Sequence, residues 1–146
     1  MSKPKAIVSA CLLGEYCRYD GKTKQVDEVI ESLKGYEIIP FCPEAPIFGT
    51  PRQRINVVRI DGQDRIITDE TNIDVTKLLE DEIHSFIKDN PQADKIILKS
   101  KSPSCGLGTT PILDEKKDII ANGNGIAAEI FLKYFLSTDI IQEDNL

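Results

Sequence analysis

Four cysteines draw attention first, because they lie in segments that could bring several thiols to one place. They are Cys11, Cys17, Cys42 and Cys105, in a chain of 146 residues that contains one histidine. Cys11, Cys42 and Cys105 each follow a short run rich in isoleucine, valine or leucine, which is typical of a buried strand. Since an open α/β sheet builds its active site beyond the carboxyl ends of its strands, these thiols are expected to meet there, as a metal or cluster site would require.

The spacing of the cysteines excludes several common cysteine sites. The sequence has no Cys-x-x-Cys, so neither a thioredoxin-type redox pair nor a zinc ribbon is indicated, and ferredoxin-like runs of cysteines are missing too. A single cysteine is often just a small buried hydrophobic residue. Several cysteines placed among Gly, Pro, Ser, Arg and Glu in loops are better explained by chemistry.

Two of these loops carry further groups that could react or bind. Glu44 stands two residues after Cys42 and could act as a general acid or base, although an exposed glutamate would look the same in sequence. The loop around Cys105 contains Pro103, Gly106 and Gly108, so its backbone N–H groups could form a nest that binds an anion or stabilises a thiolate. The alternative is a plain connection between a strand and the next element.

Basic residues are concentrated beside the cysteines in a chain that is acidic overall. The net charge is −6 and the pI is about 4.8, which argues against general nucleic-acid binding. The residues in or beside the cysteine segments are Arg18, Arg52, Arg54, Lys99 and Lys101. Solvated surface charge would explain any one of them. Together they predict a locally positive pocket, with Arg18 or Arg52 pointing toward the thiols, either paired to Asp20 or Glu44 or left for an anion.

The pattern of apolar residues predicts a single three-layer α/β domain of Rossmann-like type over residues 1–146, with a mainly parallel sheet and an inserted β-hairpin. The expected strands are 5–10, 37–41, 94–99 and 139–142, the hairpin is 55–60 with 65–68, and the helices are 25–34, a long one from Asn72 or Asp74 to Asn90, and 126–136. An apolar stripe of Val75, Leu78, Leu79, Ile83, Phe86 and Ile87 is expected on the long helix, with His84 off it. Residues 100–125 carry no clear pattern and are expected to be irregular.

The size and the ends of the sequence bear on its compartment. A chain of this length can bury a core without disulfides. Its start leads directly into a strand-like run, and no apolar stretch approaches a membrane span, so we expect neither a signal peptide nor a membrane partner. A cytoplasmic location follows, where recurrent cysteines stay reduced and more often bind metals.

These motifs together resemble the thiouracil desulfidase family, which was long catalogued as a domain of unknown function. The resemblance spans almost the whole chain in the same order. It is carried by the segment with both early cysteines at 9–21, Phe-Cys-Pro-Glu at 41–44, Phe-Gly-Thr-Pro-Arg at 48–52, Asp-Val-Thr at 74–76, Lys-Ser-Lys-Ser-Pro-Ser-Cys-Gly at 99–106 and Gly-x-Gly-x-Ala-Ala at 123–128. After the Ser-Cys-Gly motif, this chain has Pro111–Lys117 where typical members have a tyrosine-containing turn.

The resemblance implies a 4Fe–4S cluster held by three cysteines, with one iron left open for the sulfur of a thiocarbonyl compound. The reaction that it implies is a hydrolytic, non-redox desulfuration, with Glu44 and a serine that maps to Ser102 as catalytic residues. Since Cys11, Cys42 and Cys105 follow parallel strands, we expect these three to be the ligands, with Cys17 as the alternate. The cluster can be lost when the protein is prepared in air.

The expected substrate is a small thiolated base or nucleoside, and thiolated tRNA remains an alternative. Arg18, Arg52, Ser104 and Gly106 are the residues that we expect to contact the substrate or an anionic part of it. Two other functions remain open. A metal or iron–sulfur sensor or carrier would have four closed ligands and no pocket, and a cluster-free cysteine hydrolase would need a base that His84 is poorly placed to supply.

Overall fold

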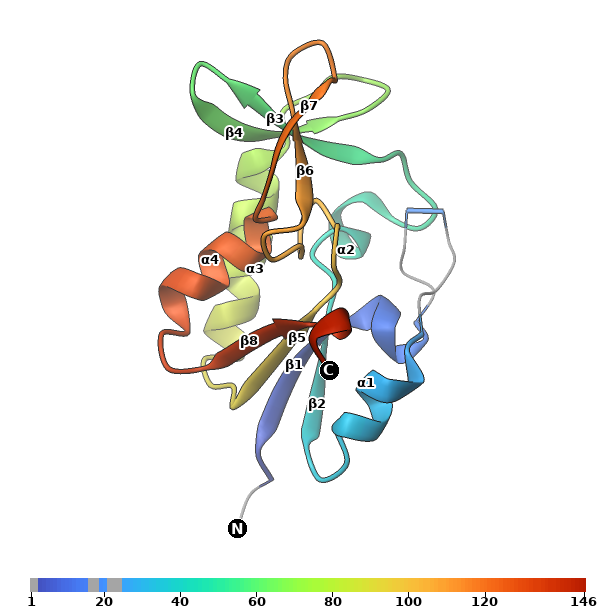
Figure 1. Cartoon of the computed structure of the whole chain (residues 1–146), viewed down its shortest axis with the longest axis vertical. Helices are drawn as coiled ribbons and strands as arrows, with labels where there is room; N and C mark the ends of the chain where they lie inside the picture. Colours follow the sequence, from blue (N-terminus) through green and yellow to red (C-terminus); the bar gives the residue numbers. More distant parts are fainter. Residues whose placement is uncertain (1–2, 16–18, 21–24) are drawn as a thin grey trace.

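A computed structural model describes residues 3–15, 19–20 and 25–146, and its centre is a fully parallel four-stranded sheet (Figure 1). The strands are β1 (Lys5–Ser9), β2 (Glu37–Phe41), β5 (Lys95–Leu98) and β8 (Asp139–Gln142), in the order β2-β1-β5-β8. Ala6, Ile7 and Val8 have no exposed surface, because helices cover both faces of the sheet. The four predicted strands are confirmed to within a residue.

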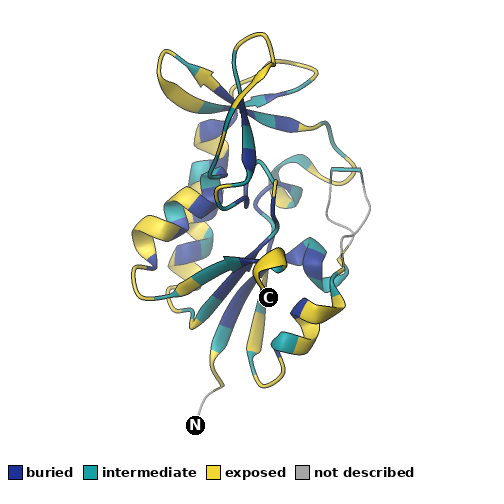
Figure 2. Cartoon of the chain, in the orientation of Figure 1, coloured by how far each residue is buried: buried dark blue, intermediate teal, exposed yellow. Residues whose placement is uncertain are grey.

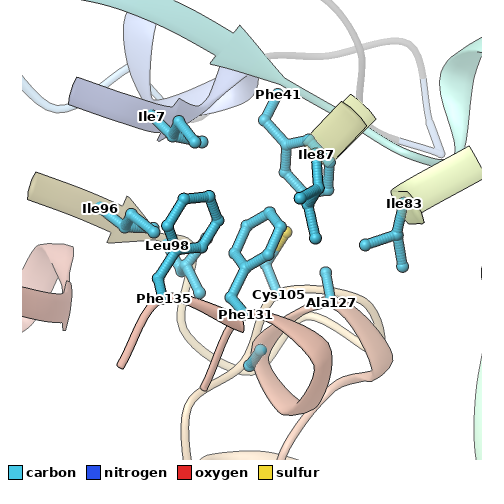
Figure 3. Packing of buried hydrophobic residues seen from close by; sticks show 11 residues of the cluster. Ile7, Phe41, Ile83, Ile87, Ile96, Leu98, Cys105, Ala127, Phe131 and Phe135 are labelled. Carbon is cyan, nitrogen blue, oxygen red and sulfur yellow. The ribbon is translucent and has the colours of Figure 1, made fainter. Parts of the chain in front are cut away.

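Helices on both faces complete the three predicted layers. On one face, Val29 and Leu33 of the segment around α1 (Asp27–Ser32) pack with Val8 and with Leu12 of the 3₁₀ turn η1 (Ala10–Leu13). On the other face lie α3 (Thr76–Asp89) and α4 (Ile126–Tyr134). Figure 3 shows the aromatic rings and isoleucines that join these helices to the sheet, with Cys105 among them.

A second sheet differs from the expected simple hairpin. It contains β3 (Ile55–Ile60), β4 (Gln63–Thr68), β6 (Thr110–Leu113) and β7 (Ile119–Gly123), in the order β4-β3-β6-β7. The β3–β4 hairpin turns at Asp61 and Gly62, which both have positive φ, as a tight hairpin turn requires. The expectation that residues 100–125 are irregular is wrong, because β6 and β7 form a second hairpin whose strand β6 pairs in parallel with β3.

The helices depart from the predicted bounds in a few places. The first is shorter than 25–34, and a helix that was not predicted, α2 (Ala45–Phe48), follows Glu44. On α3, Leu79, Ile83 and Ile87 are buried, whereas Leu78 is 53% exposed, so the predicted apolar stripe is narrower than expected. The N-cap of α3 is Val75 and not the predicted Asn72 or Asp74, although Asp74, one residue earlier, accepts a hydrogen bond from the Thr76 N–H at 2.9 Å.

The buried and exposed residues follow these layers. Figure 2 shows buried positions along the central strands and on the inner sides of the helices, with exposed positions on the outer hairpins. The chain ends in a short 3₁₀ turn, η2 (Glu143–Asn145), directly after β8. Among the described residues, we find no helix with the length and apolar character needed to cross a membrane.

Candidate functional site

Three cysteines line one cavity of about 690 Å³ beside the carboxyl ends of the parallel strands. Cys11 lies in η1 just after β1, Cys42 directly follows β2, and Cys105 follows β5 through a six-residue loop. Glu44 and Ser102 line the same cavity. The prediction that strand ends gather these segments is therefore confirmed for the described residues. Cys17 and Arg18 lie outside the described residues, so the alternate ligand and one predicted basic contact stay predictions.

The cavity lies between the two sheets. One wall comes from the parallel sheet and the loops after it, and the other comes from β3 and β6 of the second sheet. The lining residues of the second sheet are Ile55, Asn56, Val57, Thr110, Pro111 and Leu113. In Figure 1 the second sheet lies apart from the parallel sheet, with the strands β1, β2 and β5 ending toward it. A volume of this size is typical of a small-molecule site.

The side chain of Cys105 has two hydroxyl groups beside it and lies near two other acidic groups. The pKa of the Cys105 thiol is raised to about 12, chiefly because the side chain is buried and to a smaller degree because Cys42 and Glu44 lie nearby. The hydroxyls of Ser9 and Ser102 hydrogen-bond to this side chain and act in the opposite direction. A thiolate at this position therefore needs a cation to offset its burial, as a coordinated metal would do. The donor set of three cysteines at one cavity fits an iron–sulfur cluster.

A site for one isolated metal ion is not formed in the described part of the chain. No three His, Cys, Asp or Glu side chains are grouped there closely enough to hold one. In an iron–sulfur cluster, each cysteine binds a different iron, so its ligands are spaced more widely than those of a single ion.

Glu44 is held in place by two donors at the cavity wall. Ser104 donates from Oγ to Glu44 Oε2 at 2.8 Å, and Arg52 donates from Nε to Glu44 Oε1 at 3.4 Å. The side chains of Glu44 and Arg52 are 11% and 5% exposed. Arg52 also donates from Nη1 to the Gly49 carbonyl at 3.0 Å and to Thr50 Oγ1 at 3.2 Å. The predicted pairing of an arginine with Glu44 is confirmed, and it fixes the direction of the carboxylate.

The loop around Cys105 does not leave its amides open. The Gly106 N–H donates to the Ser102 carbonyl at 2.9 Å, and the Gly108 N–H donates to Asn124 Oδ1 at 2.8 Å. The predicted anion nest, and with it the contact assigned to Gly106, is therefore wrong. Gly106 instead lets the loop pack closely, because a Cβ there would lie 2.9 Å from the Ser102 carbonyl oxygen and would collide with Thr110.

The two serines of this loop differ in their access to the cavity. Ser102 lines the cavity, and its Oγ accepts hydrogen bonds from the N–H groups of Ser104 and Cys105 at 3.2 and 3.0 Å. Ser104 has no exposed surface, so the prediction that it contacts substrate is wrong. It acts on the site through Glu44.

The other basic residues line the cavity as predicted. They are Arg54, Lys99 and Lys101. Lys99 is partly neutralised by Glu143 of η2, since Nζ lies 3.5 Å from Oε2, and Arg54 donates to the Tyr19 hydroxyl. Lys99 therefore joins the C-terminal turn η2 to the cavity wall, and Arg54 joins Tyr19 to it.

One polar group at the cavity was missed. Asn56 lies on β3 within the cavity wall and donates from Nδ2 to Asp69 Oδ1 at 2.8 Å. In the sequence, Asn56 is the one polar residue in the otherwise apolar run Ile55–Val58, and this could have marked it as a candidate site residue.

Comparisons with known proteins were consistent with one family. Residues 6–144 match the family model described as 2-thiouracil desulfurase. The uncharacterized protein YbbK of Bacillus subtilis (strain 168) is 31% identical over 112 residues, which cover 70% of this chain and 73% of that protein. The solved structure of the 4Fe–4S-dependent thiouracil desulfidase TudS is similar with a TM-score of 0.73 and 28% identity, and the match covers 99% of this chain and 93% of that one.

Proposed function

The chain belongs to the 2-thiouracil desulfurase family, and we propose that it is a 4Fe–4S-dependent enzyme that removes sulfur from a thiouracil-type compound. The observation that carries the proposal is the joint position of Cys11, Cys42, Cys105 and Glu44 at one cavity. A carrier or sensor would coordinate its metal or cluster with four protein ligands and would have no cavity beside it. The cavity therefore supports an enzyme over the alternative of a cysteine-coordinated carrier.

Cys11, Cys42 and Cys105 would hold the cluster. Thiolates are the ligands that iron–sulfur clusters take, and three of them leave one iron without a protein ligand. When bound, the cluster supplies a soft Lewis acid that matches the sulfur of a thiocarbonyl group. The hydroxyls of Ser9 and Ser102 would then hydrogen-bond to the Cys105 sulfur, as they do in the structure.

The reaction that we propose is hydrolytic and needs no net electrons. The carbon–sulfur double bond is replaced by a carbon–oxygen double bond, water supplies the oxygen, and sulfur leaves as hydrogen sulfide. The carbon keeps its oxidation state, so no reductant or oxidant is consumed.

Glu44 is the group that we assign to the proton of the attacking water. It lines the cavity, and both of its carboxylate oxygens accept hydrogen bonds from groups that hold them in place, Ser104 and Arg52. A positioned carboxylate of this kind can accept a proton from water and return it to the leaving group. Ser102 lines the same cavity, and its hydroxyl is a second group there that can donate a hydrogen bond.

The proposal is tested by anaerobic purification, with assays of iron and sulfide and an absorption spectrum. We expect about four irons per chain and a broad band at about 400 nm. With 2-thiouracil, the loaded protein should release uracil and sulfide. Single substitutions to serine at Cys11, Cys42 and Cys105 should each remove the band and the turnover, whereas Cys17→Ser is the matched control and should keep both. A protein that binds the cluster and leaves 2-thiouracil unchanged would contradict the proposed enzyme.

A further inference from the structure

The wall of the cavity opposite the cysteines presents one amide beside an apolar surface. Asn56 belongs to β3, and Pro111 and Leu113 belong to β6, its parallel neighbour. Val57 pairs with Ile112 in the register, and both side chains are buried in the core beside α3. Since side chains alternate along strands, Asn56, Pro111 and Leu113 share the opposite face of the sheet, and all three line the cavity. An apolar surface with one polar edge suits a flat heterocyclic ring.

The orientation of the Asn56 amide is fixed by its partner. Asn56 Nδ2 donates to Asp69 Oδ1 at 2.8 Å, and a carboxylate can only accept, so the nitrogen and not the oxygen must face Asp69. Lys117 holds Asp69 from the other side, since its Nζ lies 3.2 Å from Oδ1 and 2.8 Å from the Asp69 carbonyl oxygen. The hydrogen bonds from Asn56 and Lys117 lower the pKa of Asp69, which keeps it an acceptor.

This arrangement leaves two groups of the amide for a ligand. One is Oδ1, an acceptor that no hydrogen bond in the described part of the chain uses, and the other is the second N–H of Nδ2. A neighbouring acceptor and donor in one plane are complementary to a ring N–H next to a carbonyl oxygen.

We propose that Asn56 recognises the imide edge of a thiopyrimidine, with Oδ1 accepting the ring N–H and Nδ2 donating to the adjacent carbonyl oxygen. Asp69 and Lys117 act as positioning residues that prevent the amide from turning over. This inference rests on the proposed function and narrows its substrate to thiouracil-type rings. A thiocytosine-type ring presents a ring nitrogen acceptor and an amino donor at the same edge, so it would meet the amide with both groups reversed and would be rejected.

The test uses the cluster-loaded protein and two readouts. One is the dissociation constant of uracil and of cytosine by isothermal titration calorimetry, and the other is KM and kcat with 2-thiouracil and 2-thiocytosine. Asn56→Ala should weaken uracil binding and raise KM for 2-thiouracil by roughly 10–100-fold, as expected for two neutral hydrogen bonds, with a much smaller change in kcat. Arg59→Gln is the control, because Arg59 is an exposed β3 residue paired to Asp64 and lies outside the cavity lining.

Asp69→Asn tests the orientation separately. Its side chain can both donate and accept, so the Asn56 amide would be free to turn, and the preference for uracil over cytosine should fall at least 10-fold while both rings still bind. Should Asn56→Ala fail to fold in a thermal melt, the nearly isosteric Asp69→Asn decides the question. An unchanged uracil-to-cytosine ratio in the folded variants would overturn the inference. Absence of turnover in the unmodified, cluster-loaded protein would instead count against the proposed function, because uracil binding is measured without turnover.

Discussion

The hydrogen bond from Ser104 to Glu44 can be removed to test whether Ser104 positions the Glu44 carboxylate. Ser104 has no exposed surface, and its Oγ donates to Glu44 Oε2 at 2.8 Å. A hydrogen bond to a charged group contributes about 1.5–3 kcal/mol to the free energy of unfolding. Ser104→Ala should therefore lower the melting temperature by roughly 3–12 °C for a chain of this size. Ser32→Ala is the matched control, because Ser32 donates to the Val29 carbonyl in α1 and does not line the cavity.

The effect on turnover separates positioning from stability. With Glu44 held by Arg52 alone, we expect kcat for 2-thiouracil to fall about 10-fold, because a misplaced base is less effective. Glu44→Gln keeps the shape and removes the proton acceptor, so kcat should fall by roughly 10²–10⁴-fold with the cluster intact. Adding Ser104→Ala to Glu44→Gln should then change kcat less than about 3-fold, since the two residues act as a unit. Fully multiplicative effects, or an unchanged kcat in Ser104→Ala, would refute the positioning role.

Two further substitutions test the surroundings of the site. Gly125→Ala would place a Cβ 2.6 Å from the Ser104 carbonyl oxygen and 2.8 Å from the Cys105 N, so iron content after reconstitution should drop. Gly35→Ala is the control for backbone strain alone, because Gly35 has a φ of +86°, its Cβ would meet nothing within 4 Å and it lies outside the cavity lining; it should keep its iron. Equal iron contents in the two variants would show that the Cys105 loop tolerates the shift. Arg52→Lys should lower kcat or the melting temperature with little change in KM, because a lysine cannot bond Glu44 and the Gly49 carbonyl with separate guanidinium nitrogens. A rise in KM alone would assign Arg52 to substrate binding instead.

The parallel sheet and the gathering of the cysteines could be predicted because both depend on simple patterns. A strand buried on both faces gives a continuous apolar run, as in Ala6–Val8, and parallel strands end at one edge. The direction of single side chains in the Cys105 loop could not be predicted. Ser102 and Ser104 are alike in type and neighbourhood, and only the turn geometry buries one and leaves the other at the cavity.

The sequence predicted only the β3–β4 hairpin of the second sheet, because β6 and β7 depend on tertiary pairing. β6 has four residues and contains Pro111, which disfavours a strand when the sequence is considered alone. In β7, Ile119 and Ile120 are both exposed, so the alternation that marks a half-buried strand is missing. Pairing with β3 stabilises β6, and the same pairing forms the cavity wall that carries Asn56. The cavity wall formed by β3 and β6 was therefore the part of the site that the sequence predicted least well.

The most direct test of a hydrolytic desulfidase follows oxygen from water into the product. The cluster-loaded protein is mixed anaerobically with 2-thiouracil in ¹⁸O-labelled water, without an electron donor or acceptor, and the products are measured by mass spectrometry and a sulfide assay. We predict that uracil carries one ¹⁸O atom and that one sulfide is released for each uracil formed. Formation of uracil only when an electron donor is supplied, or uracil without the label, would contradict a hydrolytic, non-redox reaction at this site.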